Sequence, residues 1–180
     1  MHIKVRYPRG SVLKFIILIL IFTNLSCATT QSSLYSETLR DIESGSIDFA
    51  FMKLNNYLQE YPNSTRTPKI KFGIIEYYFQ TKNYRNAIRE LTKYIIDYPD
   101  EKSSVFAQAI LYKILLEYKK DSPLIEKLKE AFFSKPIFLV FSDSKTKSYK
   151  SIFNNNYKIV DYVNEIEVYK NNELLIEITP

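Results

Sequence analysis

Two stretches of the sequence share one pattern: IDFAFMKLNNYLQEYP at residues 47–62 and YRNAIRELTKYIIDYP at residues 84–99. Aligned at their last residue, they match at Ala50 and Ala87, Leu54 and Leu91, Tyr57 and Tyr94, and the closing Tyr-Pro. The matching positions fall on one face of an α-helix. Proline ends a helix because it lacks the backbone N–H and clashes with the preceding turn. The two stretches therefore predict two helices with the same buried face.

The pattern has a fixed period, since Pro62, Pro99 and Pro136 follow one another at intervals of 37 residues. Between the prolines lie segments at 69–79 and 104–118 that are apolar around most of a helix, which predicts helices packed on several sides. A degenerate third copy covers residues 124–136. A period of this length predicts a mainly α fold, a short solenoid of helix pairs over residues 34–136, with about 2.5 to 3 repeats.

The N-terminus has the composition of a secretory leader. Residues 1–14 are basic and residues 15–22 are apolar, a run too short to cross a bilayer. Residues 1–26 are therefore predicted to be a signal peptide. Ser26 precedes Cys27 in a stretch that resembles a bacterial lipobox. The resemblance implies cleavage between Ser26 and Cys27, and an N-acyl chain and a diacylglycerol on Cys27. The alternative is an ordinary signal peptide followed by a chance cysteine.

Composition argues against several functions for the remaining chain. Four of the 25 Lys and Arg residues lie in the leader with no acid, which leaves 21 bases against 20 acids. That balance does not favour a nucleic-acid partner. His2 is the only histidine, Cys27 the only cysteine, and two of the three glycines lie beyond the leader. The sequence therefore points to no enzyme, metal site or cofactor, apart from the lipid expected on Cys27.

The two ends of the expected solenoid differ from it. Residues 27–33 are interpreted as the lipidated cysteine with a polar tether. Residues 137–180 begin with an apolar run at 137–141 and a polar stretch at 142–151. Apolar and acidic residues then alternate at 165–169 and 174–178, which predicts a β-hairpin, with 157–163 as an optional third strand. The hairpin either packs on the end of the solenoid or pairs with a partner's strand, and both remain open.

A partner would bind along a face lined by the first helix of each pair. Spacings of three and four residues place a mixed aromatic and charged set on that face. The candidate residues are Tyr35, Lys69, Phe72, Glu76, Phe79, Lys113 and Glu117. Such a groove suits an extended peptide or a protein loop. The alternative is that the C-terminal segment covers the same face and these residues are core.

The helical pattern resembles the tetratricopeptide repeat. The residues that carry this resemblance are Ile74, Tyr78, Tyr84, Ala87, Leu91 and Pro99. The three extra residues per period follow the proline, as Asn63-Ser-Thr and Asp100-Glu-Lys. Together with the lipobox, this rhythm is similar to the BamD family of outer-membrane lipoproteins, of which the chain would be a short and divergent member. The C-terminal segment departs from that family's all-helical pattern.

The resemblance implies a non-enzymatic scaffold on the periplasmic side of the bacterial outer membrane. Its expected partner is the insertase subunit of the β-barrel assembly machine. One alternative is an envelope-maintenance adaptor similar to the Tol-Pal-associated protein CpoB. Another is a surface lipoprotein that binds host ligands. The sequence does not decide between these partners.

Overall fold

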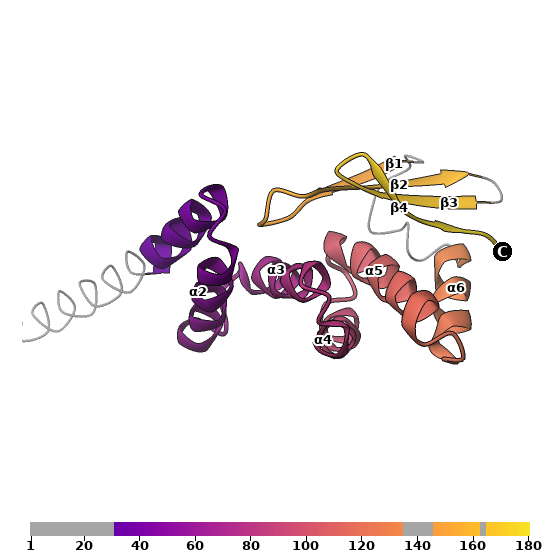
Figure 1. Ribbon diagram of the computed structural model, residues 1–180, viewed down its shortest axis with the longest axis horizontal. Helices are drawn as coiled ribbons and strands as arrows, with labels where there is room; N and C mark the ends of the chain where they lie inside the picture. Colours follow the sequence, from indigo (N-terminus) through magenta and orange to yellow (C-terminus); the bar gives the residue numbers. More distant parts are fainter. Residues whose placement is uncertain (1–30, 135–145, 163–164) are drawn as a thin grey trace, which may run out of the picture.

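The computed structural model describes residues 31–134, 146–162 and 165–180, which form paired helices with an antiparallel sheet against them (Figure 1). The N-terminal helix comprises residues 31–43. It is followed by α2 (Ile47–Glu60), α3 (Thr67–Gln80), α4 (Tyr84–Asp97), α5 (Lys102–Tyr118) and α6 (Leu124–Phe133). The predicted class, a short helical-hairpin solenoid with a small β segment at its C-terminus, is confirmed.

The repeated face of the two quoted stretches is buried as predicted. Its residues in α2 and α4 are Ala50, Leu54, Tyr57, Ala87, Leu91 and Tyr94, all at most 1 % exposed. Each repeated tyrosine also makes a hydrogen bond to a serine beyond the proline. The Tyr57 hydroxyl lies 2.9 Å from Ser64 Oγ, and the Tyr94 hydroxyl 2.6 Å from Ser103 Oγ. The repeat thus fixes both the apolar packing and the link to the following helix.

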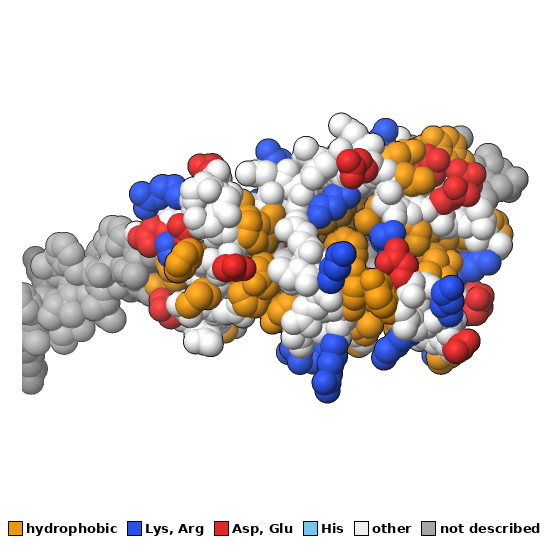
Figure 2. Space-filling model, in the orientation of Figure 1, with side chains coloured by type: hydrophobic (Ala, Val, Ile, Leu, Met, Phe, Trp, Pro, Cys, Tyr) orange, Lys and Arg blue, Asp and Glu red, His pale blue; other side chains and the backbone are white. Residues whose placement is uncertain are grey.

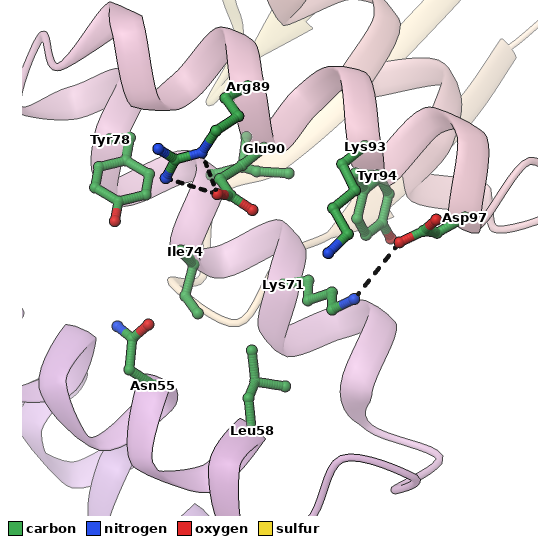
Figure 3. Close-up of a pocket in the computed structure, with 11 residues that line it drawn as sticks. Asn55, Leu58, Lys71, Ile74, Tyr78, Arg89, Glu90, Lys93, Tyr94 and Asp97 are labelled. Carbon is green, nitrogen blue, oxygen red and sulfur yellow. Dashed lines mark hydrogen bonds and ion pairs between the residues drawn. The ribbon is translucent and has the colours of Figure 1, made fainter.

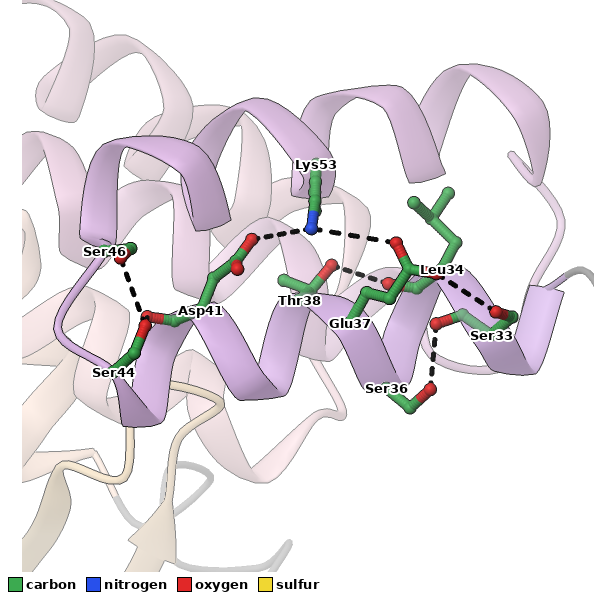
Figure 4. A network of polar contacts seen from close by, with 9 residues as sticks. All are labelled: Ser33, Leu34, Ser36, Glu37, Thr38, Asp41, Ser44, Ser46 and Lys53. Carbon is green, nitrogen blue, oxygen red and sulfur yellow. Dashed lines mark hydrogen bonds and ion pairs between the residues drawn. The ribbon is translucent and has the colours of Figure 1, made fainter.

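The N-terminal helix is tied to α2 by polar contacts along its length (Figure 4). Lys53 Nζ of α2 lies 2.8 Å from Asp41 Oδ2 and 3.7 Å from Glu37 Oε2. Gln31 Nε2 donates to the Tyr57 hydroxyl at 2.8 Å. Residues 31–33 are therefore helical, which corrects the prediction that they belong to the tether; Cys27 and residues 28–30 lie outside the described residues.

In the described residues, the C-terminal sheet has four strands in the order β1-β2-β3-β4, each antiparallel to the next. They are β1 (Thr146–Lys150), β2 (Asn156–Tyr162), β3 (Glu165–Lys170) and β4 (Glu173–Ile178). The predicted hairpin is β3 and β4, and the optional third strand is β2. Asn171 and Asn172 connect β3 to β4. Their positive φ angles of 52° and 67° are those of a tight hairpin turn. β1 lies in the stretch interpreted as polar, and the apolar run at 137–141 lies outside the described residues.

The sheet packs across the helical array rather than only on its end. Its buried residues Tyr157, Ile159 and Val168 share one core with α3, α4, α5 and α6. The turn between β1 and β2 reaches toward the N-terminal helices (Figure 1). There Ile152 and Phe153 join a second buried cluster with the N-terminal helix, α2 and α3. The sheet therefore contacts both halves of the array.

This contact depends on Gly73, in the middle of α3. A Cβ at Gly73 would overlap with Ile152 Cγ2 and would lie 3.4 Å from Phe153 Cε2. We expect Gly73→Ala to lower the free energy of unfolding by about 1–3 kcal/mol, because a buried methyl overlap outweighs the helix propensity of alanine. Urea denaturation measures this loss. In an Ile152→Ala background, the same substitution should become neutral or stabilising, and an unchanged loss there would contradict the explanation.

Candidate functional site

The predicted groove residues do not form one open surface in the structure. Phe72 and Glu76 are completely buried, and Lys69 and Glu117 are exposed. Tyr35, Phe79 and Lys113 are partly buried. Lys113 Nζ makes an ion pair with Glu117 Oε1 at 2.8 Å on α5, and the Arg66 guanidinium covers the Tyr35 ring at 4.6 Å. The structure thus brings Phe72 together with Glu76 in the core and pairs Lys113 with Glu117 nearer the surface, but it does not unite the set in one groove.

Aromatic residues of the sheet occupy the centre of the predicted groove. The ring of Phe72 meets Tyr149 edge-on, with 5.4 Å between centroids, and Tyr157 in the same way at 5.6 Å. Tyr94 of α4 completes this cluster at 6.0 Å. Edge-to-face contacts of this kind add to the stabilisation from burial. Phe72 is therefore a core residue at the junction between the helices and the sheet.

Glu76 is a buried carboxyl at the same junction. Its Oε1 accepts hydrogen bonds from Asn155 Nδ2 at 2.8 Å and from the Tyr157 hydroxyl at 2.9 Å. Its Oε2 is buried without a hydrogen-bond partner among the described residues. Burial raises the pKa of Glu76 to about 7, against the opposing effects of its hydrogen bonds and of the charge on Lys170. The carboxyl holds the β1–β2 turn and β2 on α3.

These contacts correct the prediction that Phe72 and Glu76 are available to a partner. For these two residues the alternative expectation holds, because the C-terminal segment covers the part of the face where they lie. The sequence did contain a signal for this arrangement. Glu76 is the one carboxylate in the apolar stretch 70–79, and a lone acid there requires hydrogen-bond donors from elsewhere in the chain.

A hollow between α2, α3 and α4 remains open, and we call it the α2–α4 pocket. Its volume is about 220 Å³. The residues that line it include Asn55, Leu58, Ile74, Ile75, Arg89 and Lys93. Figure 3 shows side chains of α2 and α4 on opposite sides of a floor made by α3. This pocket is not among the sites predicted from the sequence.

The α2–α4 pocket carries more positive than negative charge. Its bases are Lys71, Arg89 and Lys93, and its acids are Glu90 and Asp97. Both acids already have partners, since Arg89 Nη2 lies 2.9 Å from Glu90 Oε1 and Lys71 Nζ lies 3.7 Å from Asp97 Oδ2. Lys and Arg side chains gather over α4 in Figure 2, at its lower centre. The sequence feature that could have indicated this basic surface is the spacing of Arg85, Arg89 and Lys93, which lie four residues apart at exposed positions of α4.

Within residues 31–134, 146–162 and 165–180, no group of His, Cys, Asp and Glu side chains could hold a metal ion. Within the same ranges, no helix is long and apolar enough to cross a membrane. Ser26 and Cys27, predicted to be the cleavage and lipidation sites, lie outside the described residues.

Comparison with known protein families finds a match over most of the chain. The model of a family described as YfiO, outer membrane lipoprotein, matches residues 27–160. The matched region starts at Cys27, includes all the helices described above, and ends within β2. No curated protein and no solved structure gives a significant match to the chain.

Proposed function

The chain belongs to the YfiO family of outer membrane lipoproteins, and from this we propose that it is a non-enzymatic scaffold for outer-membrane β-barrel assembly. In this proposal, the signal peptide is removed before Cys27, and Cys27 carries a diacylglycerol and an N-acyl chain. The helical array faces the periplasm and binds protein partners. The principal partner is the insertase subunit of the assembly machine.

The observation that carries this proposal is the position at which the family match begins. The matched region starts at Cys27, which is also the cysteine that the lipobox pattern selects for acylation. Two or more acyl chains anchor a protein stably, because each buried CH₂ contributes about 0.8 kcal/mol. The described helices follow closely, since only residues 28–30 separate Cys27 from the helix at residues 31–43. The anchor would therefore hold the N-terminal end of the array near the membrane.

Replacing Cys27 by alanine is expected to abolish lipidation and to release the protein from the membrane. The thiolate is the only acceptor for the diacylglycerol, and no other cysteine is present to replace it. Labelling with an alkyne fatty acid and partition into Triton X-114 measure the two effects. Ser26→Ala is the matched control, because alanine keeps a small residue before the cysteine and should leave processing intact. Fatty-acid labelling of the Cys27→Ala protein would contradict the proposed anchor.

Purification of a tagged, chromosomally expressed chain from mild-detergent membranes tests the partner. Mass spectrometry should find the barrel-assembly insertase in stoichiometric amount with the wild-type chain, and reduced recovery with Cys27→Ala. Recovery of Tol-Pal or peptidoglycan-associated proteins instead would favour the envelope-maintenance adaptor. Digestion of the protein by protease added to whole cells would favour the surface lipoprotein.

A further inference from the structure

We propose that the α2–α4 pocket binds an acidic segment of a partner protein, with one apolar side chain of that segment on the pocket floor. The proposal rests on the proposed function only in taking the partner to be a protein. It places the binding surface on α2 and α4, away from the face that the chain's own sheet covers.

The floor of the pocket provides an apolar contact for a single side chain. Ile74 and Ile75 of α3 lie beneath the hollow, and Leu58 of α2 extends it on one side. Leu58 points into the space between the helices in Figure 3. A volume of about 220 Å³ accommodates a side chain of leucine size with part of its backbone. A partner residue of this kind gains the usual stabilisation from burial of its apolar surface.

The positive charges of the pocket favour a carboxylate of the partner next to its apolar side chain. With Glu90 and Asp97 paired to Arg89 and Lys71, the ammonium of Lys93 has no ion pair in the part of the chain that the structure describes. Lys93 points into the pocket from α4 in Figure 3. One turn before Arg89, the exposed Arg85 continues the basic stripe. An acidic segment along α4 would pair with this stripe, and a basic one would be repelled.

On the α2 side of the pocket, Asn55 provides a polar group that can bind the backbone of the partner's acidic segment. Asn55 Nδ2 donates to the carbonyl oxygen of Phe51 at 2.8 Å, which fixes the orientation of the amide. Its Oδ1 then remains to accept a hydrogen bond from a peptide N–H. In Figure 3, the amide of Asn55 points from α2 toward the end of the pocket where Tyr78 and Arg89 lie. The pocket thus combines a cation, a hydrogen-bond acceptor and an apolar floor, which together suit an extended acidic peptide.

Binding of a defined peptide to the purified mature lipoprotein in mild detergent tests the proposal. The probe is a fluorescein-labelled peptide of Glu and Asp with one central Leu, and its matched control has Gln and Asn in place of the acids. Fluorescence anisotropy should show saturable binding of the acidic peptide alone, weaker at higher salt. Lys93→Glu should weaken this binding about tenfold or more, which corresponds to about 1.4 kcal/mol.

A matched variant separates the pocket from general electrostatics. Lys127→Glu makes the same change of charge at an exposed position of α6, outside the pocket, and should leave peptide binding unchanged. Circular dichroism should show the same thermal unfolding for both variants, since both lysines are exposed. Absence of binding, or equal weakening by both substitutions, would overturn the proposal. Displacement of the peptide by anionic phospholipid vesicles, dependent on Lys93, would assign the pocket to a lipid surface instead.

This assay can fail independently of the proposed function. It uses purified protein and a synthetic peptide, so it needs neither the insertase nor a membrane. Peptide binding that depends on Lys93, together with no insertase in the co-purification, would reject the assembly role and keep the acidic-segment site. Recovery of the insertase without Lys93-dependent peptide binding would support the assembly role and would show that the partner binds at another surface.

Discussion

Phe72→Ala is expected to lower the free energy of unfolding by about 3–5 kcal/mol. The ring has no exposed surface and contacts aromatic rings of α4, β1 and β2. Its removal would leave a cavity at the junction between the helices and the sheet, where Tyr149 and Tyr157 are held by their own strands. Urea denaturation followed by circular dichroism measures the loss. Phe49→Ala is the control, because Phe49 is 66 % exposed and should change stability by less than about 0.5 kcal/mol.

This result would change how groove variants are interpreted. A Phe72→Ala protein that fails to recover its partner would have lost the junction, and not a binding contact. Retention of full stability by Phe72→Ala would instead show that the sheet leaves the helices in solution. The predicted groove would then be open, and Phe72 would again be a candidate for partner binding.

The helical part of the fold was predictable because it depends on local spacing. Ala50, Leu54 and Tyr57 recur at intervals that place them on one helical face, and that face is buried in both repeats. The proline after each stretch marked the end of the helix. Asn171 and Asn172 identified the hairpin turn for a similarly local reason, since asparagine tolerates positive φ.

β1 was not predictable in this way. Thr146–Lys150 has the sequence TKSYK, which contains one large apolar residue and reads as a polar stretch. It forms a strand because β2 offers an edge, with Tyr149 opposite Tyr157 and Lys147 opposite Ile159. Pairing with a neighbouring strand determines strand formation where the residues themselves have little intrinsic β propensity.

Local sequence patterns also could not predict that the C-terminal sheet covers the groove. The spacing of Phe72 and Glu76 predicted one shared helical face, and the structure confirms that both lie at one junction. What covers that face depends on Asn155 and Tyr157, 79 and 81 residues away from Glu76 in the chain. The α2–α4 pocket likewise needs three helices in their final arrangement. Helix periodicity gives the face of each helix, and only packing determines which faces stay open.

Glu76→Gln is expected to stabilise the protein at pH 8 and to have little effect at pH 5. Burial raises the pKa of the Glu76 carboxyl to about 7, whereas an unfolded glutamate has a pKa of about 4.3. Between these values the folded protein binds a proton that the unfolded chain has lost. Stability from this group therefore falls as pH rises through that window, and the loss is complete above pH 7. Its size is about 3–4 kcal/mol.

The hydrogen bonds at the junction survive this substitution. A glutamine Oε1 can accept from Asn155 Nδ2 and from the Tyr157 hydroxyl as the carboxyl does, but its amide never ionises. Nearby, burial lowers the pKa of Lys170, while the charge of Glu76 raises it, so the neutral variant also loses that attraction. The gain at pH 8 should therefore be about 2–3 kcal/mol, less than the full cost of ionisation.

Urea denaturation at pH 5, 6, 7 and 8 would measure this difference. The curves of the wild-type and Glu76→Gln proteins should coincide within about 1 kcal/mol at pH 5 and diverge as pH rises. Glu117→Gln is the matched control on exposed surface, and its pH dependence should follow that of the wild type. Parallel curves for wild type and Glu76→Gln would mean that Glu76 ionises equally in the folded and unfolded chains. Because a carboxyl enclosed by α3, the β1–β2 turn and β2 cannot do so, the sheet would then have to lie away from α3.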